Sequence, residues 1–144
     1  MSFRALDYSV SVIALKKDEN LYGMTCAWTM QVDFDKMVCL LGSQSHTGAI
    51  IKKGDFVGIS VLSKNQKELA IHFGENHSTE KNKFEEIKYH IKNGAIMLPS
   101  STRTLCCRVL DVLHLKGIEE DSLIYVEILD KKENGDDFLH YSEL

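Results

Sequence analysis

Residues 23–32 have the sequence Gly23-Met24-Thr25-Cys26-Ala27-Trp28-Thr29-Met30-Gln31-Val32. Threonine, tryptophan and valine give this stretch the composition of a β-strand. Small and hydroxyl side chains, such as those of Thr25 and Ala27, stand where a strand of the core would carry bulk. This pattern indicates that a flat ligand lies against the strand.

A second segment passes from an apolar strand through glycines and hydroxyls into a short helix, with the sequence Leu41-Gly42-Ser43-Gln44-Ser45-His46-Thr47-Gly48-Ala49-Ile50-Ile51. Backbone N–H groups and the positive end of the helix dipole attract anions at such a helix start. We expect the side chains of Ser43, Ser45 and Thr47 to bind a phosphate there. His46 either donates to this phosphate or faces water, and Ser45 has the alternative role of a helix cap only. The two segments together predict a nucleotide-like cofactor.

Length and composition predict one ordinary globular domain, residues 1–144, with a hydrophobic share of 44% and a charged share of 26%. The formal net charge of −4 and the mixing of lysines with glutamates argue against nucleic-acid binding. No apolar run is long enough to span a membrane, and no secretion signal is visible. We therefore expect a cytoplasmic protein that does not bind membranes.

Cysteine and histidine spacing argues against a metal site. The four cysteines, Cys26, Cys39, Cys106 and Cys107, lack the paired spacing of zinc ligands or of a redox dithiol. Adjacent Cys106 and Cys107 would point to opposite faces of a strand. The six histidines are scattered along the chain. We expect buried, reduced thiols and no metal.

The remaining pattern predicts many strands and few, short helices. Strands are expected at 8–15, 21–32, 37–41, 56–62, 103–115, 122–129 and 138–141, with a polar loop at 75–83. Ser45 is expected to cap a helix at 46–53 that stops at Gly54. A capping box of Ser63 and Gln66 is expected to start a second helix that ends at Gly74. This composition of elements favours an antiparallel barrel.

In the order of its segments, the chain resembles the flavin reductase-like family, whose fold is a split barrel that binds FMN. The resemblance rests on Gly23-Met24-Thr25-x-x-Trp28, on Ser43-x-x-x-Thr47-x-x-Ile50, on the segment from Gly54 to Phe73, on Lys83-Phe84 and on Pro99. It implies a mainly β fold, an antiparallel split β-barrel with a few short helices, of the flavoredoxin and flavin reductase type.

The resemblance also implies the residues that bind the cofactor. The flavin ring would lie along Gly23, Met24, Thr25, Cys26, Ala27, Trp28 and Thr29. The phosphate would lie against Ser43, Gln44, Ser45, His46 and Thr47, with Lys83 and Phe84 completing the site. No residue is assigned a catalytic role, because a hydride that arrives at the flavin ring needs no protein nucleophile.

By the same resemblance the protein is an FMN-binding oxidoreductase that passes electrons from NAD(P)H, or from a protein donor, to an acceptor. Two barrels of this family pack together, which implies a homodimer. The chain departs from the family where serine is replaced by Ala27, and where a turn rich in proline is replaced by Lys36-Met37. These departures keep open a non-enzymatic FMN-binding electron carrier, sensor or dimeric binding module.

Overall fold

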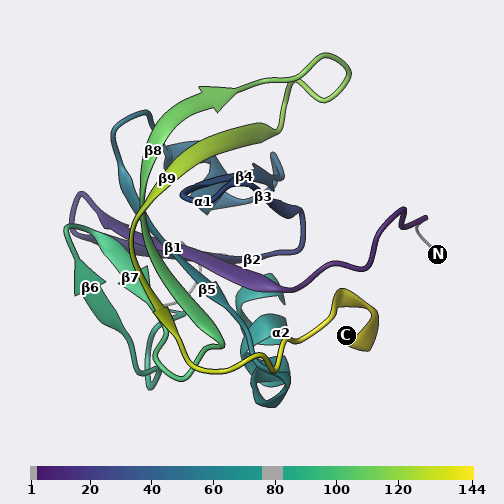
Figure 1. Ribbon diagram of the computed structural model, residues 1–144. Coiled ribbons are helices and arrows are strands. Elements are labelled where there is room, and N and C mark those ends of the chain that lie inside the picture. Colours follow the sequence, from purple (N-terminus) through teal and green to yellow (C-terminus); the bar gives the residue numbers. More distant parts are fainter. Residues whose placement is uncertain (1–2, 76–82) are drawn as a thin grey trace.

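The computed structural model describes residues 3–75 and 83–144, so most of the loop predicted at 75–83 lies outside the described residues. Within the described part, nine strands form a mostly antiparallel sheet, and the helices are short (Figure 1). The sheet is not closed, as expected of a split barrel. The prediction of a mainly β split barrel is confirmed.

The strands run in the order β3-β4-β9-β8-β5-β1-β7-β6, and β2 pairs with β1 off this path. Their bounds are β1 Ser11–Lys17, β2 Asn20–Cys26, β3 Thr29–Asp33, β4 Lys36–Leu41, β5 Phe56–Val61, β6 His90–Lys92, β7 Ala95–Met97, β8 Arg103–Leu113 and β9 Ser122–Glu133. The helices are α1, His46–Ile50, and α2, Lys67–Glu75, which follows a 3-10 turn at Lys64–Gln66; a further 3-10 turn spans Tyr141–Glu143. No helix among the described residues has the length and apolar character needed to cross a membrane.

The predicted hairpin of 8–15 and 21–32 exists, but its second strand is broken. β1 pairs with β2 from Ser11 opposite Cys26 to Lys17 opposite Asn20. The chain then leaves β1 at Ala27 and Trp28, and β3 pairs with β4 instead. The backbone N–H of Leu40 donates to the Trp28 carbonyl at 2.9 Å, which holds the break against β4.

Two apolar clusters fill the fold. The inner face of the curved sheet encloses one of them, which includes Ile13, Cys39, Ile59 and Ile124. The opposite face of β1 packs against α2 and contributes to the second cluster, which includes Phe73. Burial of both faces explains why four consecutive residues of β1, from Val12 to Leu15, are apolar.

Close approach of two strands requires glycine at position 58. A Cβ atom built on Gly58 of β5 would lie 1.9 Å from the carbonyl oxygen of Ile96 in β7, which is far inside van der Waals contact. Because Gly58 has no side chain, the β6–β7 hairpin can pack closely against β5.

The caps were predicted better than the helix ends. Ser45 accepts a hydrogen bond from the N–H of Gly48, and Gln66 accepts one from the N–H of Ser63, each at 2.9 Å. The first helix was wrongly extended to residue 53, because Ile51 is already extended. Its end is held by the carboxylate of Asp55, which accepts a hydrogen bond from the N–H of Lys52 at 2.8 Å. The second helix includes Gly74 and is described as far as Glu75.

The final strand predicted at 138–141 is wrong. Its residues form two isolated bridges, Ser9 with His140 and Ser63 with Phe138. The N–H of Leu139 donates to the carbonyl of Leu62, and the carbonyl of Leu139 accepts from the N–H of Val10. The segment therefore lies between the end of β5 and the start of β1. A single extended ladder is therefore not formed.

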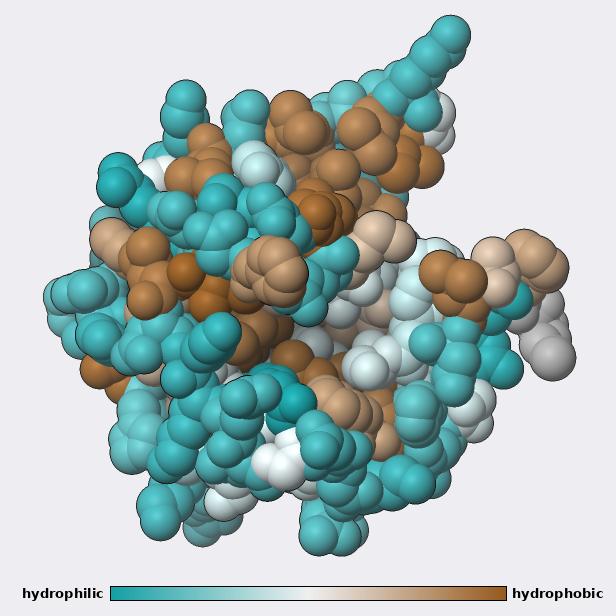
Figure 2. Space-filling view, viewed as in Figure 1, coloured by the Kyte–Doolittle hydropathy of each residue, from teal (hydrophilic) through white to brown (hydrophobic). Residues whose placement is uncertain are grey.

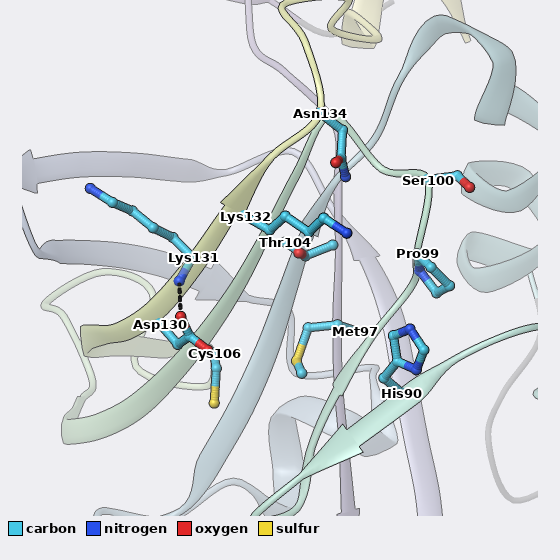
Figure 3. A pocket seen from close by; sticks show the side chains of 10 residues that line it. All are labelled: His90, Met97, Pro99, Ser100, Thr104, Cys106, Asp130, Lys131, Lys132 and Asn134. Carbon is cyan, nitrogen blue, oxygen red and sulfur yellow. Dashed lines mark hydrogen bonds between the residues drawn. The ribbon is translucent and has the colours of Figure 1, made fainter.

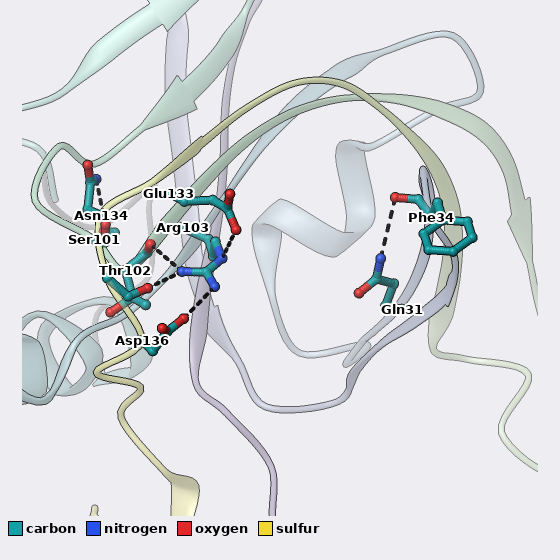
Figure 4. Close-up of polar contacts among 9 residues, drawn as sticks. Gln31, Phe34, Ser101, Thr102, Arg103, Glu133, Asn134 and Asp136 are labelled. Carbon is teal, nitrogen blue, oxygen red and sulfur yellow. Dashed lines mark hydrogen bonds and ion pairs between the residues drawn. The ribbon is translucent and has the colours of Figure 1, made fainter.

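Arg103 fixes the start of that segment against the sheet (Figure 4). Its guanidinium lies 2.9 Å from the carboxylate of Asp136 and 3.4 Å from that of Glu133, and it donates to the carbonyls of Thr102 and Gly135. The chain is thereby directed back across the fold toward α2, where its last residues border the candidate site.

Candidate functional site

A groove of about 420 Å³ lies between the end of β2 and helix α2. β2 and the residues after it contribute Met24, Thr25, Cys26, Ala27 and Trp28, which are five of the seven residues predicted to lie along a flat ligand. The other walls are Leu40, Gly42, Ala70, Ile71, Gly74, Glu75, Asp121, Tyr141 and Leu144.

Hydrogen bonds between the walls give the groove its shape. The hydroxyl of Thr25 donates to the backbone carbonyl of Ala70 at 2.5 Å, which joins β2 to α2. The thiol of Cys26 donates to the carbonyl of Leu40 at 3.4 Å, which joins β2 to β4. The groove is therefore a preformed space between elements that are already connected.

Small residues line much of this groove. Ala27, Gly42, Ala70 and Gly74 present little or no side chain to it. A Cβ built on Gly42 meets nothing within 4 Å, and one built on Gly74 would lie 3.6 Å from Thr25. A planar ring can therefore approach the backbone closely, as a flat ligand requires.

The predicted phosphate segment lies at one end of the groove, where Gly42 lines it. Ser43, Gln44 and His46 are exposed, so their polar groups are accessible to an anion. Ser45 uses its hydroxyl to cap α1 and to donate to the carbonyl of Gly42 at 2.9 Å. Thr47 is only 1% exposed and belongs to the buried side of α1.

Asp121, at the turn between β8 and β9, is a part of this site that the sequence did not predict. Its carboxylate accepts a hydrogen bond from the N–H of Ser43 at 2.9 Å. An acidic side chain thus lies against the first amide of the predicted phosphate segment. The two residues are 78 positions apart, and no local pattern connects them.

Gly23, Lys83 and Phe84 lie beside the groove rather than in its lining. The buried amine of Lys83 donates to the carbonyls of Gly23 at 2.8 Å and of Phe73 at 3.1 Å. A Cβ built on Gly23 would lie 2.9 Å from the ring of Phe84 and 3.0 Å from that of Phe73. In the structure these three predicted site residues support β2 against α2.

Thr29, the last predicted strand residue, lines a different cavity on the other side of Trp28. The indole of Trp28 is 54% exposed and lies against the ring of Tyr8, with centroids 5.3 Å apart. This aromatic pair separates the groove from the cavity that contains Thr29.

The thiols are buried, as expected. Burial raises the pKa of Cys26 to about 11 and that of Cys107 to about 12, and it raises the pKa of Cys39 well above its usual value. None of these three is a thiolate at neutral pH. Within residues 3–75 and 83–144, no three histidine, cysteine or acidic side chains gather into a metal-binding group.

The walls contributed by α2 and Tyr141 were also missed. Helical spacing of Ala70 and Gly74 places small residues on one face of α2, which is a signal that could have been used. The position of Tyr141 depends on the return of the chain after β9, and no sequence pattern reveals that path.

A second pocket, of about 410 Å³, lies between the β6–β7 hairpin and the ends of β8 and β9 (Figure 3). It is lined by His90, Met97, Pro99, Ser100, Thr104, Cys106, Asp130, Lys131, Lys132 and Asn134. None of the residues predicted to bind a cofactor lies in it, so the groove beside α2 is the candidate site.

Known structures share this fold at low sequence identity. A Sinorhizobium meliloti 1021 protein has a TM-score of 0.83 and 17% identity over 95% of this chain, which spans 47% of the length of that protein. The NADH:FAD oxidoreductase SgcE6 of Streptomyces globisporus C-1027 has a TM-score of 0.80 and 16% identity, with 90% of this chain and 77% of that chain covered. Flavoredoxin from Methanosarcina acetivorans has a TM-score of 0.79 and 13% identity, with 93% and 75% covered.

A comparison with curated protein sequences found no match. The family model described as "Flavin reductase like domain" matches residues 3–143. This match confirms the resemblance inferred from the sequence. The chain therefore belongs to the flavin reductase-like family.

Proposed function

We propose that this chain binds FMN in the groove beside α2 and passes electrons from NAD(P)H, or from a protein donor, through the flavin to an acceptor. The observation that carries the proposal is the position of Met24–Trp28, which form one wall of a groove lined by small residues in a chain of this family. The other walls come from elements on both sides of the sheet break, so the site depends on the fold as a whole.

The flavin ring would pack against the small residues Ala27, Ala70 and Gly74. Backbone groups at the break between β2 and β3 would lie near the edge of the ring. The exposed residues Ser43 and His46 would receive the phosphate, and Gly42 leaves space for the chain that joins ring and phosphate. This end of the groove would bind a flavin with a terminal phosphate more tightly than riboflavin, because charge-assisted hydrogen bonds are stronger than neutral ones.

The bound flavin supplies hydride and electron chemistry at its ring. The residues of this chain position the ring, exclude water from the face against β2 and leave the other face open to a donor. Glu75 and Asp121 add negative charge to the rim, which disfavours a reduced, anionic flavin there. No side chain is required as a nucleophile.

We also propose that the protein is a homodimer that works in the cytoplasm, where buried thiols stay reduced. Exposed apolar side chains support an interface; they include Trp28, Met30, Val32 and Phe34 near β3 and Leu113, Leu115 and Ile118 near the β8–β9 turn. Figure 2 shows such side chains gathered at the upper edge, over this turn. Sedimentation equilibrium tests the assembly, and a monomer fully loaded with flavin would contradict it.

The function is tested by titrating the flavin-free protein with FMN and riboflavin and following flavin fluorescence. FMN is expected to bind about tenfold more tightly than riboflavin or better. NADH and NADPH are then added without oxygen while the flavin absorbance is recorded. Bleaching by either supports a reductase. Tight flavin binding without bleaching by either nucleotide favours the electron carrier, sensor or binding module. Failure of FMN to bind would reject the proposal.

A further inference from the structure

The cavity beyond Trp28 lies at the end of the barrel where β1 and β3 begin and β5 ends. Paired residues on neighbouring strands point to the same face of a sheet. Ser11 pairs with Cys26 and with Val61, both of which belong to or pack against the inner apolar cluster. Thr29 pairs with Cys39 in the same way. Ser11 and Thr29 therefore point toward the barrel interior.

This end of the barrel, which we call the barrel mouth, holds a cavity of about 320 Å³. Its lining is Leu6, Asp7, Tyr8, Ser9, Ser11, Thr29, Met30, Gln31, Met37 and Val61. A space of this size is at the lower end of the range found for small-molecule sites. Apolar walls and several hydroxyl or amide groups are the composition of such sites.

Ser11 is the most informative residue of the barrel mouth. Its side chain is 1% exposed, and its hydroxyl has no hydrogen-bond partner among the described residues. A neighbouring serine behaves differently: Ser60 on β5 is fully buried, and its hydroxyl accepts from the N–H of Leu98 at 2.8 Å. Burying a hydroxyl without a partner destabilises a fold. Ser11 is one of the lining residues of the barrel mouth, so a ligand there could supply the partner that this hydroxyl lacks.

Charge limits what the ligand can be. Among the residues that the structure describes, no lysine, arginine or histidine lines the barrel mouth, and Asp7 is the acidic residue of its lining. The Asp7 carboxylate lies 3.2 Å from the ring Nδ1 of His140 at the rim. An anion would be repelled by Asp7 and would find no cation in the lining, so an uncharged ligand fits better.

The polar groups of the barrel mouth can serve such a ligand. The side chain of Gln31 donates one N–H to the carbonyl of Phe34 at 3.4 Å (Figure 4). Its amide has a second N–H and a carbonyl oxygen, and hydroxyl groups can both donate and accept. Met37 and Val61 provide apolar contact beside them.

We propose that the barrel mouth is a second ligand site, which takes an uncharged, mostly apolar small molecule that presents a hydrogen-bonding group to Ser11. The Trp28–Tyr8 pair separates it from the groove proposed for flavin. The proposal does not depend on flavin binding, because the unpartnered hydroxyl of Ser11 and the lining that support it belong to the barrel mouth.

The first test compares the thermal stability of two serine variants. Ser11→Ala removes a buried hydroxyl without a partner, so the Tm of the ligand-free protein is expected to rise or stay unchanged. Ser60→Ala is the matched control and is expected to lower the Tm, because it leaves the N–H of Leu98 without its acceptor. A lower Tm for Ser11→Ala would show that this hydroxyl stabilises the fold, and the proposal would be overturned.

The second test uses benzamide and benzoate, which have nearly the same shape and differ in charge. Each is titrated into the protein, with and without saturating FMN, while methyl NMR signals of Met30 and Met37 are followed. Benzamide is expected to shift these signals and to bind more tightly than benzoate. Ser11→Ala is expected to weaken benzamide about fivefold, the value of one hydrogen bond. Absence of binding, equal affinity for Ser11→Ala, or displacement by FMN would each overturn a separate second site.

Discussion

The carboxylate of Asp121 accepts a hydrogen bond from the backbone N–H of Ser43, with the two atoms 2.9 Å apart. The pair brings the β8–β9 turn to the start of the segment that we propose binds phosphate. A carboxylate in this position repels a phosphate and competes for the same amide.

Asp121→Asn is therefore expected to strengthen FMN binding. Removing one charge near an exposed dianion changes the interaction by about 1 kcal/mol, which corresponds to about fivefold in affinity, and less at high salt. Riboflavin is the control, since it has no phosphate and its affinity should not change. Titrations at two salt concentrations measure both. Equal gains for FMN and riboflavin would place the phosphate elsewhere.

Lys83 was predicted to bind the cofactor, and in the structure it joins β2 to α2. Lys83→Met keeps the length of the side chain but leaves two buried carbonyls without this donor. Unfolding by urea is expected to show a loss of about 2 to 4 kcal/mol. An unchanged unfolding free energy together with a loss of FMN affinity would instead support a direct role for the amine.

Gly58 is expected to tolerate no side chain. Gly58→Ala would place a methyl group against the Ile96 carbonyl and force β5 and β7 apart, at a cost of about 3 kcal/mol. Gly42→Ala is the matched control, because its Cβ would meet nothing within 4 Å. Thermal unfolding of both variants measures the difference, and similar Tm values would contradict the close approach of these strands.

The buried thiols make the free energy of unfolding decrease at alkaline pH. The pKa of Cys26 is about 11 in the folded protein, against the ordinary value of 9.0. The unfolded chain therefore loses its thiol proton first, so stability is complete below pH 9 and falls between about pH 9 and 11. Cys26→Ala should reduce this fall in urea unfolding measured across that range. An equally steep fall would assign it to other groups.

Electron transfer is expected to be independent of the cysteines. Single changes of Cys26, Cys39, Cys106 and Cys107 to alanine should preserve flavin reduction by whichever donor works, since the raised pKa values keep these thiols protonated. Loss of turnover in Cys26→Ala with flavin still bound would point to thiol chemistry.

Sequence patterns predicted the helices and strands that are determined by residues close together in the chain. Alternation and β-branched residues predicted β1 and β5. Cap side chains predicted the start of α1 and the start of the 3-10 turn that precedes α2. The β6–β7 hairpin was missed because its strands have only three residues each, although Asn93 and Gly94 in its turn, both with positive φ, were a usable signal.

The sequence anticipated the lining of the candidate groove only where its residues are consecutive in the chain. Met24–Trp28 are consecutive, and their composition predicts that a flat ligand lies against them. Asp121 and Tyr141 reach the groove through the β8–β9 turn and the segment held by Arg103, so their positions depend on tertiary structure. Lys83 and Thr47 are polar residues whose burial no local pattern revealed.

Gly74 lines the groove between β2 and α2, so substituting this residue tests whether flavin occupies the groove. Gly74→Ala adds a methyl group that fits at 3.6 Å from Thr25, and replacing glycine within a helix stabilises it by up to about 1 kcal/mol. Gly74→Leu also favours the helix but fills the groove.

The measurement is the FMN dissociation constant of the wild-type protein and both variants, with the Tm of each recorded without ligand. We predict that Gly74→Ala binds FMN like the wild type, and that Gly74→Leu binds it at least about tenfold more weakly while keeping the wild-type Tm or a higher one. Wild-type FMN affinity in a folded Gly74→Leu variant would show that the flavin does not lie in this groove.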